Sequence, residues 1–316
     1  MSSHVAAPPH LAAIMELARG NPNVVVVSQD FGAGPFTEAF PGRHFEVGIS
    51  EQNLVGVAAG LAHAGKIPFV LCMAPFVSMR GFEQIRDDCA YNRNNVKIIA
   101  LFTGLEAGPW GATHHSMEDI ALLRTIPGMT ILVPADSNQV VPAVHAAASI
   151  DGPVYVRLAG FAADMAPIEG AGPLRAGVAS VLREGSRLTM IATGTTVRTV
   201  LAVHEALASD GISARVLNMH TIKPLDRDAV VLAAEQTGLL LTVEEHSIIG
   251  GLGSAVAEVV AEIGVGRLRR AGIPDRFVTE IAPYRELLAL CGLDAAGVES
   301  AARQLIGSGN RVAPLP

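Results

Sequence analysis

The sequence predicts an α/β protein made of two doubly wound domains. Short apolar runs, typical of buried strands, alternate with amphipathic or alanine-rich segments that are typical of helices. Repeated β-α units of this length favour a mostly parallel sheet with helices on both faces. The alternation stops once, between residues 160 and 177, in a stretch rich in Gly, Ala and Pro, which indicates a linker.

The expected elements of the first half follow one another without a long gap. Its strands are Val- and Ile-rich runs such as 24–27, bounded by polar residues or Gly, and its longest helix starts after Ser50, the expected N-cap. In order, we expect a strand at 23–28, a helix at 51–64, a strand at 68–72, a helix at 76–92, a strand at 97–102, a helix beginning over 117–123, a strand at 130–133, a helix at 138–149 and a strand at 154–158.

The second half repeats the pattern on a smaller scale. The expected elements are a strand at 188–192, a helix at 197–209, a strand at 214–218, a helix at 227–235, a strand at 239–244 and a helix at 254–263. We therefore place the first domain at residues 1–165, the linker at 166–180 and the second domain at 181–316.

Composition excludes several classes of function. Half of the 316 residues are hydrophobic, yet no apolar run approaches the ~18 residues of a membrane helix. The formal net charge of −7, without a basic run, argues against nucleic-acid binding. The three cysteines have no metal-ligand or redox spacing, and no metal site is expected on this chain. Without a signal peptide in the sequence, we expect a cytoplasmic protein.

Two segments of the first half place chemical groups at helix starts. Glu51 follows Gly48-Ile49-Ser50 and begins a helix with several small residues; a first-turn acid favoured by the helix dipole is the simple structural explanation. Phe76, Met79 and Phe82 are spaced on one face of the next expected helix. That stripe suits either core packing or an apolar wall for a flat aromatic ligand.

A Gly-rich loop and a strand end supply the other candidates. Trp110, His114 and His115 lie in the loop 104–119, and loop histidines beside glycines are often functional. Arg157 ends a strand, where an open α/β sheet forms its ligand crevice, although a surface salt bridge is the plainer explanation. The Gly-rich run 250–253 precedes a helix and is interpreted as a tight turn rather than a phosphate site.

Taken together and in this order, these segments resemble the C-terminal half of transketolases and of deoxyxylulose-phosphate synthase, and most of all the beta subunits of split bacterial transketolases. The resemblance covers about residues 20–300. Its most specific stretches are 47–60, 76–88, 111–119 with 126–136, and 244–258.

The resemblance implies a pyrimidine-binding domain for thiamine diphosphate, followed by a transketolase C-terminal domain. Glu51 matches the family's activating glutamate, which in an apolar pocket shares a proton with the aminopyrimidine ring of the cofactor. The ring-binding segment of the family matches Phe76, Met79 and Phe82, with Arg80 among the cofactor-binding residues. His114 matches a catalytic histidine that faces substrate hydroxyls, with His115 beside it, and Arg157 matches an arginine that binds substrate phosphate.

Two departures from the family pattern bear on function. Many transketolases carry an acidic residue where this chain has Trp110, and an indole there suits either a less hydroxylated or more apolar substrate, or a residue that only covers the pocket. The family's Gly-Asp-Gly motif, which holds Mg²⁺ and the diphosphate, is absent from the sequence. The resemblance thus implies an alpha subunit that binds Mg²⁺ and the diphosphate, in an α2β2 assembly.

The expected activity is transfer of a two-carbon ketol unit from a small-molecule ketose, most simply a phosphorylated one, to an aldehyde. The alternative is the E1 beta subunit of a 2-oxo acid dehydrogenase, which shares the fold and the cofactor. Those beta chains lack the Thr-His-His-Ser-Met-Glu-Asp run at 113–119. A non-catalytic scaffold is disfavoured because Glu51, Phe76, His114 and Arg157 occur together.

Overall fold

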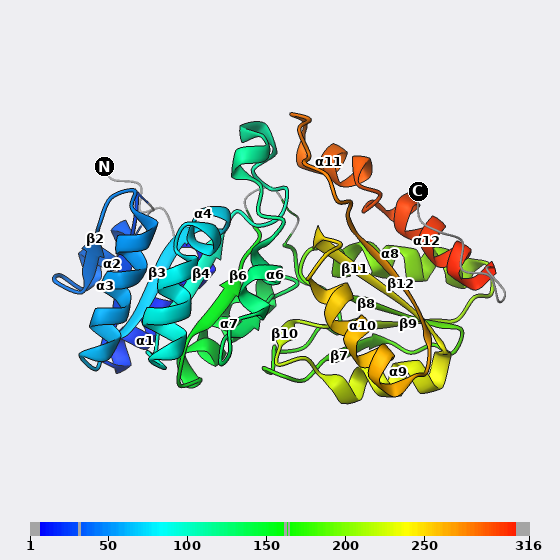
Figure 1. Ribbon diagram of the computed structural model, residues 1–316, viewed down its shortest axis with the longest axis horizontal. Coiled ribbons are helices and arrows are strands. Elements are labelled where there is room, and N and C mark those ends of the chain that lie inside the picture. Colours follow the sequence, from blue (N-terminus) through cyan, green and yellow to red (C-terminus); the bar gives the residue numbers. More distant parts are fainter. Residues whose placement is uncertain (1–6, 31–32, 161–162, 164, 308–316) are drawn as a thin grey trace.

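The computed structural model describes residues 7–30, 33–160, 163 and 165–307 and shows two α/β domains side by side (Figure 1). The α/β class with two doubly wound domains is therefore confirmed. The elements of the first domain are α1 (Pro9–Gly20), β1 (Val24–Ser28), α2 (Gly34–Ala39), β2 (His44–Glu46), α3 (Glu51–His63), β3 (Ile67–Met73), α4 (Ala74–Met79), α5 (Phe82–Gln84), η1 (Ile85–Tyr91), β4 (Lys97–Leu101), η2 (Gly108–Trp110), η3 (Ala112–His114), α6 (Asp119–Arg124), β5 (Thr130–Leu132), α7 (Ser137–Ser149) and β6 (Val154–Arg157).

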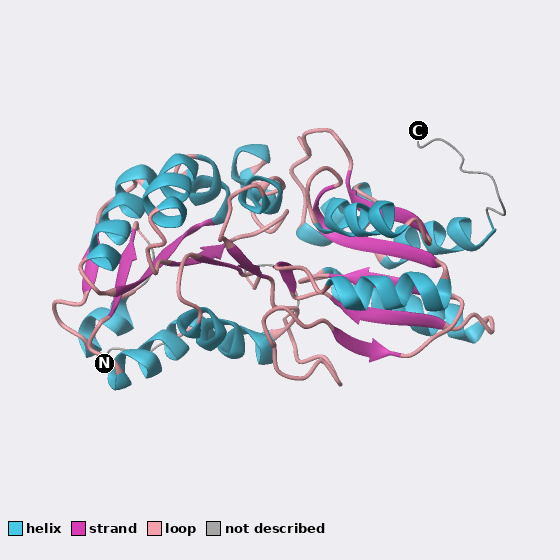
Figure 2. Ribbon diagram, turned by 60° about the horizontal axis from the view of Figure 1, so that its bottom comes forward, coloured by secondary structure: helices cyan, strands magenta, loops and turns pink. Residues whose placement is uncertain are grey.

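The first sheet is built on valine- and isoleucine-rich strands that are buried on both faces, as expected for parallel strands covered by helices. Its order is β10-β5-β6-β4-β3-β1-β2, in which β10 (Thr221–Lys223) comes from the second half of the chain. Its pairs are parallel except for β10 with β5. Helices lie on both sides of this sheet in Figure 2. One apolar cluster includes side chains of α3, α4, η1 and α6, and another includes side chains of α1, α2 and α7.

The second domain is a five-stranded sheet of order β12-β11-β8-β9-β7, in which only the edge strand β7 is antiparallel. Strands β8 and β11 are its buried centre. Its elements are β7 (Ser180–Arg183), β8 (Leu188–Ala192), α8 (Thr196–Ser209), β9 (Ala214–Asn218), α9 (Arg227–Thr237), β11 (Leu239–Ser247), α10 (Leu252–Ile263), β12 (Arg267–Ile273), α11 (Tyr284–Leu290) and α12 (Ala295–Gly307).

The two domains are joined at their seam by a shared strand pairing and a shared apolar cluster. The short strand β10 (Thr221–Lys223) leaves the second half of the chain and pairs with β5 of the first sheet. One apolar cluster is continuous across the seam, from Val70 of β3 to Val256 of α10. The domains therefore pack against each other through a common apolar core and are not joined by a linker alone.

The structure corrects several local predictions. A single helix over 76–92 is wrong, because the chain forms α4, α5 and the π-helix η1 instead. At the break, a Cβ on Gly81 would lie 2.8 Å from the Val77 carbonyl oxygen. Ser50 occupies the N-cap position of α3 but its side chain makes no capping hydrogen bond. The prediction also missed α1, α2, β2, β7, β10, β12, α11 and α12.

Among the described residues, no helix is both long and apolar enough to cross a membrane.

Candidate active site

A pocket of about 530 Å³ opens where β1 and β3 end and α3 and α4 begin. This is the carboxyl edge of the first sheet, where open α/β sheets bind their ligands. The pocket is mainly apolar, with an amide, a carboxyl group and an imidazole among its walls. Its lining residues are Gln29, Asp30, Ile49, Met73, Phe76, Trp110 and His114.

Glu51 lies immediately beside this pocket, at the first residue of α3. Only 4% of its surface is exposed, and its Oε1 accepts hydrogen bonds from Gln29 Nε2 at 2.9 Å and from Arg80 Nη1 at 3.1 Å. These donors and the helix N-terminus offset the cost of burying the carboxylate. Within the part of the chain that the structure describes, Oε2 has no hydrogen-bond partner, so this oxygen is available to a ligand.

Arg80 connects Glu51 to the aromatic wall. Its guanidinium carbon lies 4.4 Å from the centroid of the Phe76 ring, a cation–π distance. The Arg80 side chain is 56% exposed at the pocket side of α4. The sequence prediction that Glu51, Phe76 and Arg80 belong to one site therefore agrees with their proximity.

Trp110 and His114 complete the wall from the loop between β4 and α6. The His114 ring meets Phe76 edge-on at 5.2 Å and Trp110 at 5.5 Å, and Trp110 also packs against Phe102 at 5.4 Å. His114 Nδ1 is hydrogen-bonded to Thr113 Oγ1 at 3.0 Å. Its Nε2 makes no hydrogen bond to any described residue and remains for a substrate hydroxyl.

Of the predicted aromatic-wall residues, only Phe76 lines the pocket. The break of the helix at Gly81 separates Phe82, in α5, from Phe76 and Met79, which both lie in α4. Met79 ends α4 with 42% of its surface exposed, and Phe82 packs against the core cluster instead. A cofactor-contacting role for Phe82 is thus disfavoured, and Met79 is left at the rim.

Arg157 differs most from its predicted role as a phosphate ligand. It is 5% exposed, and its Nε donates to Asp119 Oδ2 at 2.8 Å. Its Nη2 donates to the carbonyl oxygens of Ser116 and Glu245 at 3.0 and 3.1 Å. All of these partners lie in the interior of the seam between the domains. Burial alone would raise the pKa of the Asp119 carboxyl, but the positive charge of Arg157 holds that pKa below its ordinary value.

His115 also lies away from the pocket lining. Its side chain is buried, and neither ring nitrogen has a hydrogen-bond partner among the described residues. Burial, together with His114 nearby, lowers the pKa of His115, so the ring is neutral near pH 7. A direct substrate contact from His115 is disfavoured by this position.

Four lining residues, Gln29, Asp30, Ile49 and Met73, were not predicted from the sequence. Gln29 and Asp30 directly follow the predicted strand at 23–28, and Met73 follows the predicted strand at 68–72. Because ligands bind at the carboxyl ends of strands in open α/β sheets, these three residues could have been predicted from the strand ends. Asp30 adopts φ of +50°, an uncommon conformation for a residue other than Gly, and Glu46 Oε1 accepts a hydrogen bond from its N–H at 2.9 Å.

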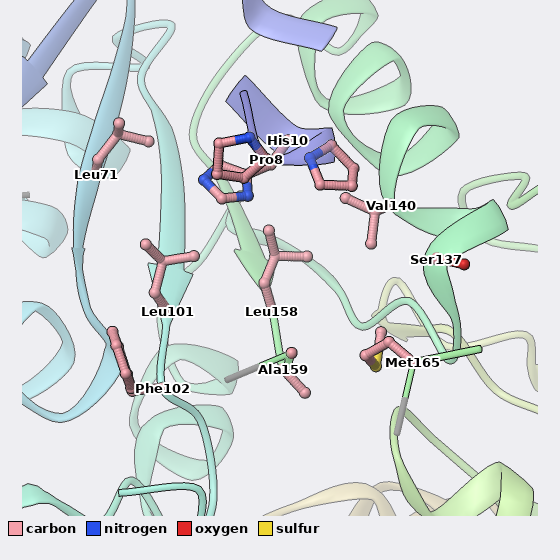
Figure 3. A pocket seen from close by; sticks show the side chains of 12 residues that line it. Pro8, His10, Leu71, Leu101, Phe102, Ser137, Val140, Leu158, Ala159 and Met165 are labelled. Atoms are coloured by element: carbon pink, nitrogen blue, oxygen red, sulfur yellow. The ribbon is translucent and has the colours of Figure 1, made fainter. Parts of the chain in front are cut away.

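A second cavity, of about 390 Å³, lies on the other face of the first sheet (Figure 3). Figure 3 shows Leu71 and Leu101 on the left and Val140 on the right, with His10 and Leu158 between them. Its walls are almost wholly apolar, and none of the predicted site residues lines it. Among the described residues that line it, His10 is the titratable side chain, and burial lowers its pKa to about 4.

The Gly-rich turn before α10 is not an anion site. The carboxylate of Glu244 accepts hydrogen bonds from the Leu252 and Gly253 N–H groups at 2.6 and 2.7 Å. The donors of this helix N-terminus are therefore already satisfied, which agrees with the tight turn that we expected. His246 lies at the domain seam, where its Nε2 accepts from Ala121 N at 3.2 Å. Among the described residues, no group of three potential metal ligands is brought together.

Comparison with known proteins places these features in a family. The family described as transketolase, pyrimidine binding domain, matches residues 11–159, and the transketolase C-terminal domain matches residues 177–298. The chain is 41% identical over 297 residues to the B subunit of the apulose-4-phosphate transketolase of Phocaeicola vulgatus, covering 93% of this chain and 95% of that protein.

Two further relatives are of the same type. The 6-deoxy-6-sulfo-D-fructose transketolase subunit SqwH of Clostridium sp. (strain MSTE9) is 41% identical over 296 residues, covering 92% of this chain and 91% of the relative. A solved structure described as a split gene transketolase, inactive beta4 tetramer, superposes with a TM-score of 0.86 at 40% identity, covering 95% of this chain and 97% of that one. The alternative of an E1 beta subunit is less supported by these relatives.

Proposed function

The chain belongs to the transketolase family as a beta subunit of the split type, and from this premise we propose that it forms, with an alpha subunit, an enzyme that transfers a two-carbon ketol unit from an anionic ketose to an aldehyde. Dependence on thiamine diphosphate follows from the family. The observation that carries the assignment of the site is Glu51, a buried helix-start carboxylate beside an aromatic-walled pocket.

The residues present fit the aminopyrimidine end of thiamine diphosphate. Phe76 offers a ring for stacking, Ile49 and Met73 offer apolar contacts, and Glu51 offers a carboxylate oxygen without a partner among the described residues. When bound, the cofactor supplies the nucleophilic carbon and the electron sink that ketol transfer requires.

Glu51 is assigned the proton-holding role. Gln29 and Arg80 both donate to Oε1, which fixes the orientation of the carboxylate and leaves Oε2 for a proton shared with a ring nitrogen. Shielding by the apolar pocket strengthens that hydrogen bond relative to one in water. Arg80 also covers the Phe76 ring and so holds the aromatic wall and the carboxylate together.

His114 and Trp110 are assigned to the substrate. His114 Nε2 is positioned to exchange a proton or hydrogen bond with a sugar hydroxyl, since Nδ1 is engaged by Thr113. Trp110 is 47% exposed and occupies the place of the acidic residue found in many transketolases. An indole there favours an acceptor with fewer hydroxyl groups on the carbon chain that faces it.

The need for a partner is supported by what this chain contains. Its sequence has no Gly-Asp-Gly motif, and its described residues bring together no metal-ligand cluster. Exposed apolar side chains lie at and near the pocket: Ile49 is 71% exposed, and Ile281, 73% exposed, has its Cγ1 3.9 Å from where a Cβ on Gly111 would lie. Such a rim is typical of a protein interface. We propose an α2β2 assembly in which the alpha subunit covers this rim and binds Mg²⁺ and the diphosphate.

The anionic end of the ketose requires a cationic group to bind it. The names of two relatives specify a sugar phosphate and a sulfo-sugar. Because Arg157 is engaged by Asp119 and two carbonyl oxygens, we assign the anion to groups of the alpha subunit, with the exposed Arg80 as the candidate on this chain.

The test is reconstitution with the alpha subunit. The purified chain, alone and with its candidate alpha subunit, is assayed with thiamine diphosphate and Mg²⁺ against a panel of phosphorylated and unphosphorylated ketoses. We expect ketol transfer and tight cofactor binding only for the pair. Full activity or tight cofactor binding by the lone chain would contradict the divided site, and an inactive pair across the panel would contradict the activity.

A further inference from the structure

The second domain makes hydrogen bonds and packing contacts with the loop that carries Trp110 and His114. Residues 104–116 form a closed loop, because Gly104 and Ser116 exchange both backbone hydrogen bonds at 3.1 and 2.9 Å. The loop leaves and re-enters the first domain at this pair, and its tip stands at the pocket. In Figure 1 the loop rises between the domains, facing the segment that leads into α11.

Both ends of the loop are bound to the same strand of the second domain. At the start, Leu105 N donates to Glu245 Oε1 at 2.7 Å, and at the end, Ser247 N donates to Met117 O at 2.7 Å. Arg157 bridges the two sides, since its Nη2 donates to both Ser116 O and Glu245 O. The carboxyl end of β11 is therefore the anchor of the loop.

Glu245 is the centre of this anchor. It is 3% exposed, and its Oε2 accepts hydrogen bonds from the hydroxyl groups of Thr195 and Tyr284, both in the second domain. Its fit against the loop is close: a Cβ added to Gly104, at φ of +62°, would lie 2.0 Å from Glu245 Oε1. Only glycine avoids both this clash and the strained backbone.

The same domain supports the loop further toward its tip. A Cβ on Gly108 would lie 2.8 Å from both Ala282 O and Leu287 Cδ1. Leu105 is fully buried in the second domain's apolar cluster together with Tyr284 and Leu287. Packing and hydrogen bonds thus place the loop from the base up to two residues before Trp110.

We propose that Glu245 is a positioning residue for ketol transfer: held by Thr195 and Tyr284, it fixes the base of the loop and thereby sets where Trp110 and His114 stand at the pocket. This rests on the proposed function. It gives the second domain a role in substrate binding although none of its described residues lines the pocket.

The chain offers a direct probe and a matched control. Trp110 is the single tryptophan, so its fluorescence in the isolated full-length chain reports the loop alone. Glu244 is the neighbour of Glu245, equally buried, yet its carboxylate caps α10 and does not touch the loop. Both Glu245→Gln and Glu244→Gln therefore perturb β11, but only Glu245→Gln disturbs the anchor of the loop.

The experiment compares Glu245→Gln, Tyr284→Phe, Gly104→Ala and Glu244→Gln with wild type. In the isolated chain we measure acrylamide quenching of Trp110, and in the assembled enzyme KM for the ketose, kcat, and the Kd of thiamine diphosphate. Because Glu245→Gln weakens the hydrogen bonds at the base of the loop, we expect it to raise KM for the ketose about tenfold, with altered quenching of Trp110 and a cofactor Kd within about twofold of wild type. Gly104→Ala is expected to change quenching and KM as Glu245→Gln does, and Tyr284→Phe is expected to change them less. Glu244→Gln is expected to have the quenching and KM of wild type.

The outcomes separate the possibilities. If Glu245→Gln leaves both the quenching of Trp110 and KM unchanged, the inference is overturned. It is also overturned if Glu244→Gln alters quenching and KM as much as Glu245→Gln does, because that would indicate general destabilisation. If Glu245→Gln does not fold, Tyr284→Phe decides, because it retains the carboxylate and loses one hydroxyl group. If the wild-type pair is inactive, the proposed function fails, while the quenching of Trp110 still decides whether Glu245 positions the loop.

Discussion

Arg80 donates a hydrogen bond to Glu51 Oε1 at 3.1 Å. The same guanidinium lies 4.4 Å from the Phe76 ring, so one exposed cation holds a buried carboxylate and an aromatic wall in place. The first test of this arrangement is the carboxylate of Glu51.

Glu51→Gln is expected to lower kcat by about 10²–10⁴-fold in the assembled enzyme, because an amide holds no ionisable proton at the position of Oε2. The measurement is steady-state ketol transfer with saturating cofactor. Glu83→Gln, which removes a carboxylate from the exposed side of α5, is the control and should retain full activity. Wild-type kcat in Glu51→Gln with an intact fold by circular dichroism would refute the assignment of Glu51.

Trp110→Asp is expected to shift specificity toward polyhydroxylated aldehydes, by about tenfold in kcat/KM relative to less hydroxylated ones. A carboxylate accepts hydrogen bonds from hydroxyl groups that the indole leaves unpaired. The ratio of kcat/KM for the two aldehyde classes is the readout. Tyr91→Ala removes another exposed aromatic ring, far from the pocket lining, and should leave the ratio alone. An unchanged ratio in Trp110→Asp would show that Trp110 only covers the pocket.

Arg157→Met is expected to lower the free energy of unfolding by about 3–5 kcal/mol, because it leaves the fully buried Asp119 carboxylate without its cation. Urea unfolding measures the loss. Arg86→Met, which breaks an exposed pair with Glu83, should leave the free energy of unfolding close to that of wild type.

The same variant separates a structural from a phosphate-binding role of Arg157. If the role is structural, KM for a phosphorylated ketose and for its unphosphorylated counterpart change together. A selective rise for the phosphorylated ketose, with stability retained, would restore the role predicted from the sequence.

His220 predicts a loss of stability in acid. Burial lowers the pKa of this histidine to about 4, below the ordinary 6.5, so the unfolded chain takes up the proton first. The contribution of neutral His220 is present above pH 6.5 and is lost as the pH falls toward 4, at up to about 1.4 kcal/mol per pH unit. Urea unfolding of wild type and His220→Gln between about pH 7 and 4.5 should therefore converge as the pH falls. Parallel curves would contradict this pKa.

The sequence placed candidate site residues well where their geometry is local. Glu51 begins α3 as the helix pattern indicated, and the loop from β4 to α6 delivers Trp110 and His114 to the pocket. Gln29 and Asp30 were missed although they directly follow a predicted strand, because their residue types carry no motif by themselves. Phe82 was expected on one face with Phe76 because residue spacing assumes an unbroken helix, and the chain breaks at Gly81.

By itself, the sequence determined the α/β class, the order of the two domains and the resemblance that made Glu51, Phe76 and His114 candidate site residues. Hydrophobic periodicity indicates which segments are buried, and short motifs indicate which groups begin a helix. Only the tertiary structure decided that Arg157 faces Asp119, that β10 joins the first sheet, and that Glu245 anchors the loop 140 positions earlier in the chain. The reason is physical: a charge or a strand finds its partner through packing between distant segments, and no local pattern of residues encodes which partner that is.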